Sequence, residues 1–270
     1  MTQQTADPRN SGPPLFRPET LLAVEAVARA MELASGGVRR EDISYKGPLD
    51  VVTTMDIAVE DLIRTAIQDC SQFPVVGEET GGVSAAGSPY WLIDPICGTR
   101  NFASGIPLYA INVALVEHDK ISIAVVGDPS TGDIAVSEAG RGAWAFKDDD
   151  VRPLLVSNQS ETVVVEAGRA AAGRRESAAQ FTAEVIRAGQ WELRNLSTTL
   201  ALAYVASGRV SAYVLFDGAA LHTGAGSLLA NEAGAVISEI NGAPWTIRSD
   251  SLVAAATPQL HEVLLALARR

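Results

Sequence analysis

Two short apolar runs of this chain end in carboxylates, and this pattern limits the possible folds more than any other feature of the sequence. Residues 73–76 are followed after one glycine by Glu78 and Glu79, and residues 90–93 are followed by Asp94. Short apolar runs bounded by turn residues are typical of buried strands. We therefore expect two buried strands that stop at acidic residues.

Two further segments place acidic side chains near the end of a predicted element. Asp56 stands where a helix is expected to begin, and Asp217 is followed by a glycine. Taken singly, each acid fits a helix start or a solvated turn. Together they can converge only if something offsets their mutual repulsion. A hard divalent cation such as Mg²⁺ does so.

Composition excludes several classes of function. The 270 residues include 21 Lys+Arg and 32 Asp+Glu, a formal net charge of −11, so we expect no nucleic-acid or anionic-membrane partner. Cys70 and Cys97 are too few for a disulfide scaffold or a Cys₄ zinc module. No apolar run reaches membrane-spanning length and no secretory leader is evident. A soluble, cytoplasmic protein with a small-molecule partner is expected.

Periodicity predicts an α/β chain with three parts. Residues 1–18 are predicted to form a disordered N-terminal tail, and residues 19–150 an α+β subdomain. That subdomain has helices over 19–35 and 56–69 and an antiparallel meander over 109–146. Residues 151–270 alternate strands and helices, which indicates a C-terminal α/β subdomain. His118 and His261 are expected to be solvated.

Several motifs in this order resemble the inositol monophosphatase family. They are Asp50-x-Val-Thr-x-x-Asp56, Val76-Gly77-Glu78-Glu79, the run from Trp91 to Phe102 containing Asp94-Pro95-Ile96-x-Gly98-Thr99, Gly140-x-Gly142-Ala143-Trp144, and Ala225-Gly226 through Gly234. The resemblance covers almost the whole chain after the tail. It implies a layered αβαβα sandwich, a homodimer, and hydrolysis of a small phosphorylated substrate with Mg²⁺.

The resemblance also implies roles for individual residues. Glu78, Asp94 and the carbonyl of Ile96 would hold one Mg²⁺, with Asp56 near a weaker metal. Thr99 and Glu78 would orient the attacking water. The amides around Gly98 and Thr99 would receive phosphate.

Three further residues are candidate substrate contacts on their own chemistry. Ser197 and Thr198 offer hydroxyls before a predicted helix, where such residues also serve as N-caps. Asp217 offers a carboxylate, although Asp-Gly is also a common turn.

The chain departs from the family pattern at two metal-ligand positions. Cys97 stands where the family has an aspartate, and His222 stands where it has an aspartate after a tryptophan. Both missing aspartates bind the same second metal in the family. If the fold is retained, Cys97 and His222 should therefore lie close to each other and to Asp94. Leu215 also falls where inositol phosphatases carry a substrate-binding glutamate.

Three hypotheses follow from these replacements. In the first, the protein is a phosphatase with Mg²⁺ at Glu78 and Asp94 and a softer ion, such as Zn²⁺, at Cys97, His222 and Asp94. In the second, Cys97 is a nucleophile and His222 its base, oriented by Asp94, for metal-independent acyl transfer or hydrolysis. In the third, the protein is a non-catalytic family member.

Overall fold

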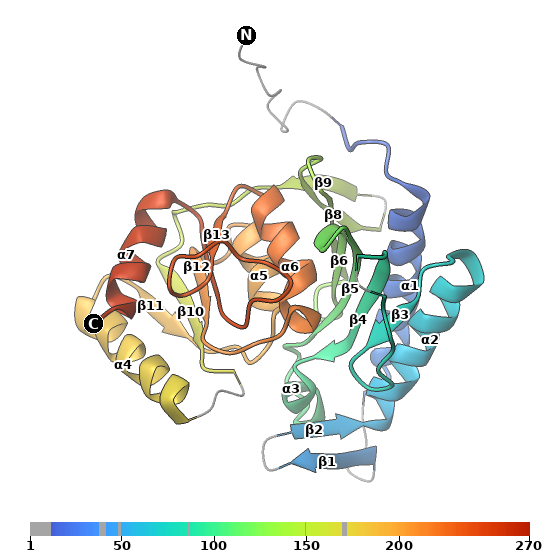
Figure 1. The fold of residues 1–270 in the computed structure, drawn as a ribbon, viewed down its shortest axis with the longest axis horizontal. Helices are drawn as coiled ribbons and strands as arrows, with labels where there is room; N and C mark the ends of the chain where they lie inside the picture. The colour runs from blue at the N-terminus through green and yellow to red at the C-terminus, as the bar shows by residue number, and fades with distance from the viewer. Residues whose placement is uncertain (1–11, 38–41, 48–49, 86, 149, 169–171) are drawn as a thin grey trace.

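Five layers of secondary structure are stacked in the computed structural model, which describes residues 12–37, 42–47, 50–85, 87–148, 150–168 and 172–270 (Figure 1). Helices α1 (Pro18–Ala34) and α2 (Thr54–Cys70) form one outer layer. A seven-stranded sheet follows, of order β3-β4-β5-β6-β7-β8-β9. Its strands are β3 (Val75–Gly77), β4 (Tyr90–Cys97), β5 (Ala110–Glu117), β6 (Lys120–Asp128), β7 (Asp133–Glu138), β8 (Ala143–Lys147) and β9 (Asp150–Leu154).

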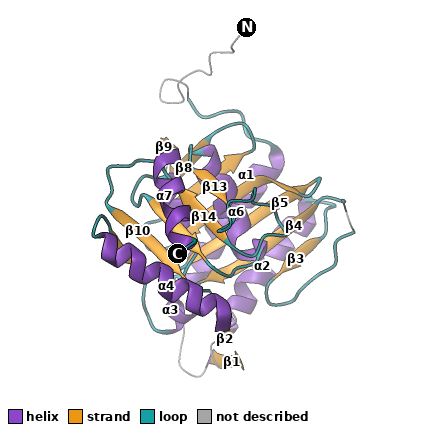
Figure 2. Ribbon diagram, turned by 60° about the vertical axis from the view of Figure 1, so that its left-hand side comes forward, coloured by secondary structure: helices purple, strands orange, loops and turns teal. Residues whose placement is uncertain are grey.

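Helices α5 (Leu200–Ala206) and α6 (Ala220–Glu232) form the central layer. A five-stranded sheet of order β11-β10-β12-β14-β13 covers its other side. Helices α4 (Ala172–Ala188) and α7 (Pro258–Ala268) form the second outer layer (Figure 2). The strands of this sheet are β10 (Thr162–Glu166), β11 (Glu192–Arg194), β12 (Ala212–Leu215), β13 (Val236–Ser238) and β14 (Leu252–Ala255). The expected layered αβαβα sandwich is therefore confirmed.

Strand β5 shows why the layers stack as they do. Successive side chains of a strand point to opposite faces, and both faces of β5 are mainly apolar, with Asn112 as a buried polar exception. Ile111, Val113 and Leu115 belong to the core against α1 and α2, whereas Ala110 and Ala114 belong to the core against the central helices. A strand buried on both faces requires a layer of helices on each side.

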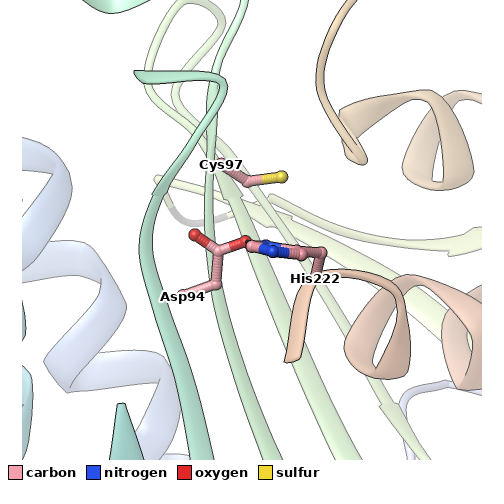
Figure 3. A group of neighbouring side chains, drawn as sticks. All are labelled: Asp94, Cys97 and His222. Carbon is pink, nitrogen blue, oxygen red and sulfur yellow. The ribbon is translucent and has the colours of Figure 1, made fainter. Parts of the chain in front are cut away.

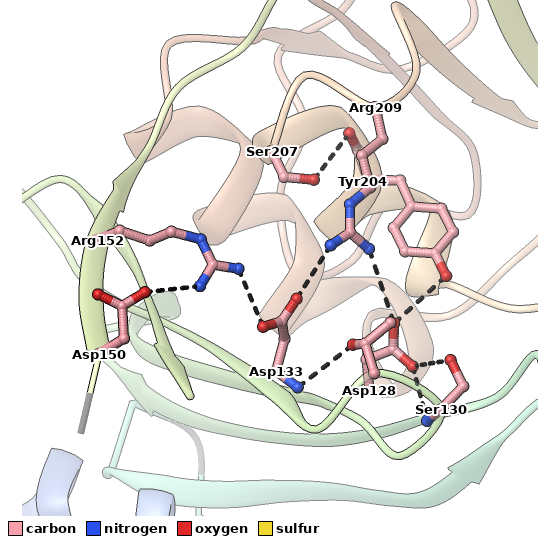
Figure 4. A network of polar contacts seen from close by, with 9 residues as sticks. Asp128, Ser130, Asp133, Asp150, Arg152, Tyr204, Ser207 and Arg209 are labelled. Carbon is pink, nitrogen blue, oxygen red and sulfur yellow. Dashed lines mark hydrogen bonds and ion pairs between the residues drawn. The ribbon is translucent and has the colours of Figure 1, made fainter. Parts of the chain in front are cut away.

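A polar network joins the seven-stranded sheet to the central layer at the C-terminal end of β6 (Figure 4). Asp133 accepts hydrogen bonds from Arg152 of β9 (2.9 Å) and from Arg209, just after α5 (3.0 Å). The Tyr204 hydroxyl donates to the nearly buried Asp128 over 3.3 Å. Because Asp128 and Asp133 of the sheet bind side chains from α5 and the residues after it, these charge-assisted hydrogen bonds fix the position of α5 on the sheet.

Most predicted elements are present, but several differ from expectation. The sequence patterns missed the hairpin of β1 (Ile43–Gly47) and β2 (Asp50–Thr53) and the short helix α3 (Thr99–Ala103). His261 is buried and lies 2.9 Å from the Ser238 hydroxyl, so its predicted solvation is wrong. No described helix has the length and apolar character needed to cross a bilayer.

The predicted disordered tail extends too far toward α1. Residues 1–11 lie outside the described part of the chain, but Phe16 is buried in the core and stacks edge-on against Phe146. The Arg17 guanidinium donates to Glu117 over 2.7 Å. Buried and ion-paired side chains therefore occur before Pro18, which is the predicted end of the tail.

A buried carboxylate shapes the turn that follows β3. Glu60 of α2 is fully buried and accepts hydrogen bonds from the Glu79 and Thr80 amides (2.7 and 3.1 Å), while Arg64 pairs with it over 3.0 Å. A Cβ on Gly77 would lie 2.1 Å from Glu60 Oε1. Only glycine fits at residue 77, and this contact sets the path of the chain through Glu78.

We predict that Gly77→Ala destabilises the protein by about 1–3 kcal/mol, because the bound Glu60 carboxylate cannot move away freely. Thermal or urea unfolding measures the change. Gly173→Ala is the matched control, since Gly173 lies in α4 with open space around it and alanine favours a helix. Equal unfolding of Gly77→Ala and wild type would contradict this account of the turn.

Candidate active site

A β-bulge in β4 brings Asp94 and Cys97 to one face of the sheet. Asp94 pairs with Asn112 of β5, but Cys97 pairs with Ala110. Between these pairs, two residues of β4 lie opposite a single residue of β5. Side chains three apart in a regular strand point to opposite faces, and a bulge reverses this. Pro95, which has no N–H to donate, lies within the bulge. Both side chains therefore face the central helices.

The parallel pairing of β3 with β4 places Glu78 beside Asp94. Gly77 pairs with Ile93, and the Glu78 amide donates to the Ile93 carbonyl over 3.1 Å. The next residue of each strand is acidic. Two carboxylates 16 positions apart in sequence thus become lateral neighbours at the edge of the candidate site.

Helix α6 adds His222 from its first turn (Figure 3). His222 Nδ1 lies 2.8 Å from Asp94 Oδ2. One ligand atom each from Asp94, Cys97 and His222 lies within 4.8 Å of the other two. The predicted convergence of these three residues is confirmed.

Asp56 and Thr99 form the adjoining wall of the site. Asp56 is fully buried in a capping box at the start of α2, where it accepts from the Thr53 amide over 2.8 Å. The Thr99 hydroxyl lies 3.1 Å from Asp56 Oδ1 and 3.0 Å from the Ile96 carbonyl. Gly98 has a φ of +108°, which L side chains rarely adopt, and turns the chain from β4 into α3.

A cleft of about 270 Å³ opens onto these residues. Glu78, Ile96, Cys97, Gly98, Thr99, Ser197 and His222 line it as predicted site residues. Val51, Arg100, Glu166, Ala167, Gly168 and Asn195 complete the lining and were not predicted. The volume suits a small molecule rather than a polymer segment.

The carboxylates of the site are difficult to ionise together. Burial, and then the charge of Asp94, raises the pKa of Glu78 to about 8. Burial raises the pKa of Asp56 to about 6, although the hydrogen bonds from Thr53 and Thr99 lower it. Asp94 Oδ1 is buried and accepts no hydrogen bond from any described residue. Since a buried, unpaired carboxylate oxygen is costly, these residues fit a bound cation.

The surroundings of Cys97 keep its thiol neutral. Its sulfur lies 2.8 Å from the Thr199 hydroxyl and accepts from the Thr199 amide over 3.3 Å. Burial, and then the Asp94 charge, raises the pKa of Cys97 to about 11. Burial lowers the pKa of His222, but the Asp94 charge and hydrogen bond outweigh it and raise that pKa well above its usual value. The positive charge of His222 is thus directed to Asp94.

The three predicted substrate contacts lie in different environments. Ser197 is exposed in the cleft with a positive φ of 53°. The geometry does not support the expected contact by Thr198, because its buried hydroxyl donates to the Cys97 carbonyl over 2.7 Å and accepts from the Leu200 amide. Asp217 is not among the lining residues and pairs with Arg174 over 3.0 Å, so its geometry does not support a substrate contact.

Two polar residues of the site, Asn112 and Glu166, were missed from the sequence. Asn112 is buried in β5 and donates to Thr199 over 3.0 Å and to Asp94 over 3.5 Å. Glu166, at the end of β10, accepts from the Leu196 amide over 3.2 Å. A polar residue inside the apolar run 110–116 was the available signal for Asn112. Glu166 ends a strand in an acid, the same pattern that identified Glu78 and Asp94.

We predict that iodoacetamide modifies Cys97 far more slowly than the exposed Cys70 at neutral pH in chelator-treated protein, because only the thiolate reacts and burial raises the pKa of Cys97. Mass spectrometry of the two cysteine peptides measures both rates. The Cys97 rate should keep rising with pH into the alkaline range. A Cys97 rate that exceeds that of Cys70 and levels off near neutral pH would contradict the assignment.

Comparisons with known proteins agree with this geometry. A sequence profile of the inositol monophosphatase family matches residues 17–270. Inositol monophosphatase 1 of Solanum lycopersicum is 31 % identical over 258 residues, which cover 90 % of this chain and 92 % of that protein. An inositol-1-monophosphatase of Mesorhizobium japonicum is 32 % identical over 239 residues, covering 86 % and 88 %.

The fold has close counterparts among solved structures. The extragenic suppressor protein suhB from Bartonella henselae superposes with a TM-score of 0.82 over 94 % of this chain and 99 % of that one, at 24 % identity. At this identity the likeness shows the fold alone, whereas the profile and the sequence relatives show common descent. The chain belongs to the inositol monophosphatase family.

Proposed function

We propose that this protein hydrolyses the phosphoric monoester of a small phosphorylated metabolite, using a metal site altered from the family pattern. The observation that carries the proposal is Asp94 Oδ1, a buried carboxylate oxygen without a described hydrogen-bond donor. Asp94 lies behind the lining of the cleft, next to Glu78, which does line it. Family membership supports the reaction class. The site chemistry supports the metal dependence.

The residues that would hold Mg²⁺ are Glu78, Asp94 and the carbonyl of Ile96, with Asp56 near a weaker site. All four offer hard oxygen atoms, the ligands that Mg²⁺ prefers. When bound, the ion neutralises the charge of the phosphate and stabilises the charge that develops during its transfer. Without a cation, these carboxylates would repel a phosphate dianion.

The chain itself would position water and phosphate. The Thr99 hydroxyl proton is directed to Asp56 and the Ile96 carbonyl, so its oxygen is available to accept a hydrogen bond from water. A water that donates to Thr99 and to the Glu78 carboxylate directs a lone pair toward the phosphorus atom. The Gly98 and Thr99 amides then bind the phosphate oxygens, and Ser197 contacts the rest of the substrate.

Cys97, His222 and Asp94 would replace the family's second magnesium site. Sulfur, nitrogen and oxygen together form a donor set that Zn²⁺ accepts and Mg²⁺ does not. Their ligand atoms already lie within 4.8 Å of one another. We therefore propose that the second ion is Zn²⁺ or a similarly soft metal.

Metal-independent catalysis by Cys97 is less well supported. A nucleophilic cysteine needs a lowered pKa, whereas burial raises that of Cys97 to about 11 and its sulfur contacts Thr199. A non-catalytic role leaves the unpaired oxygen of Asp94 unexplained. We further propose a homodimer in the cytoplasm, on the strength of the family resemblance and of the acidic, cysteine-poor composition.

We predict that Glu78→Gln lowers phosphate release by at least about 100-fold, because it removes one metal ligand and the acceptor that orients water. The assay is inorganic phosphate release from a panel of phosphate monoesters with Mg²⁺, Mn²⁺ or Zn²⁺. Glu262→Gln is the matched control, since Glu262 is exposed on α7.

Two results would contradict the proposed function. One is absence of turnover by wild type across the panel with all three metals. The other is activity that survives EDTA and disappears in Cys97→Ser, which would instead identify the Cys97 and His222 pair as the catalytic centre.

A further inference from the structure

One guanidinium borders the candidate cleft. Arg100 is the only lysine or arginine among the described residues that line it. Its side chain is exposed, and no described carboxylate or carbonyl forms an ion pair or hydrogen bond with its guanidinium. Most other arginines near acidic residues are paired, as Arg174 is with Asp217 and Asp250. The charge of Arg100 is therefore available to a ligand.

The neighbours of Arg100 in α3 make packing contacts and hydrogen bonds that fix the position of this short helix. The Thr99 hydroxyl is directed to Asp56 and Ile96. The Asn101 amide donates to the Leu108 and Leu196 carbonyls, both over 2.7 Å. Phe102 is buried against Tyr109, with ring centres 4.9 Å apart. The contacts of Thr99, Asn101 and Phe102 thus fix the position of α3. The Arg100 guanidinium makes no such contact with a described residue, and its side chain lines the cleft.

The acidic groups in the cleft do not need Arg100 as a counter-charge. Glu166 is held by the Leu196 amide over 3.2 Å and by the Tyr213 hydroxyl over 3.4 Å. Glu78 interacts with Asp94, and the nearby positive charge is that of His222. An unpaired guanidinium beside acids that contact other groups fits recognition of an anion that comes with the substrate.

We infer that Arg100 is a specificity-determining residue that binds a second anionic group of the substrate, either a carboxylate or a second phosphate. This inference rests on the proposed function, because the scissile phosphate is assigned to the adjacent Gly98 and Thr99 amides. A guanidinium binds a carboxylate or phosphate through two parallel hydrogen bonds. The cleft of about 270 Å³ can accommodate a small phosphate monoester that carries this second anion.

Matched pairs of esters test the inference. Glycerol 3-phosphate and 3-phosphoglycerate differ by a carboxylate, whereas fructose 6-phosphate and fructose 1,6-bisphosphate differ by a second phosphate. Wild type should prefer the ester with the second anion in one of the two pairs by about 10- to 100-fold in kcat/KM, as for a charge-assisted hydrogen bond. The preferred pair identifies the anion.

Arg100→Gln should reduce this preference to near unity, and Arg100→Lys, which keeps the charge but loses the two-pronged geometry, should restore part of it. Arg29→Gln is the control, because it removes the same charge from an exposed position of α1 and should keep the wild-type preference. Calorimetric dissociation constants for the same four esters report the preference without turnover.

The two proposals fail separately. Binding with the expected preference but without hydrolysis of any ester would count against the proposed function and not against Arg100. Equal binding of both members of each pair by wild type, or a preference that persists in Arg100→Gln, would overturn the role of Arg100.

Discussion

The packing of acidic side chains where β3, β4 and α2 meet is the constraint on which the rest of the site depends. Asp56 and Asp94 are fully buried, and Glu78 lies beside Asp94 through the parallel register of β3 and β4. Burying several carboxylates together is unfavourable unless they are protonated, hydrogen-bonded or bound to a cation. The protein satisfies Asp56 with a capping box and leaves one oxygen of Asp94 without a described donor.

In the proposed function, Cys97 and His222 change the chemistry of the site, because they stand where the family pattern has aspartates. The β4 bulge directs Cys97 to the same face of the sheet as Asp94, and α6 supplies His222 at 2.8 Å from Asp94. Thr199 and Asn112 extend the polar contacts around the thiol and Asp94. In that proposal, a softer, partly neutral donor set in place of carboxylates would lower the negative charge of the site and shift its metal preference away from Mg²⁺.

The sequence alone predicted the layered fold, because the family motifs occur in the family's order. It also predicted the convergence of Asp94, Cys97 and His222, because all three occupy metal-ligand positions of the family pattern. It could not assign the Thr198 hydroxyl, since a threonine before a helix can cap, contact substrate or, as here, bond a distant carbonyl. Phe16 was assigned to a tail because one buried aromatic in a polar segment leaves no periodic signal. The unpaired guanidinium of Arg100 among the described residues and the hydrogen-bond partners of Glu166 depend on long-range packing that no local pattern encodes.

The most direct test of the central claim, that the buried acids exist to hold cations, is a crystal structure of the protein grown with Mg²⁺ and Zn²⁺, with anomalous data on both sides of the zinc edge. The account predicts an ion within about 2.0–2.2 Å of Asp94 Oδ1, with the zinc signal centred between Cys97 and His222. An ordered water donating to Asp94 Oδ1, with no ion at millimolar metal, would contradict it.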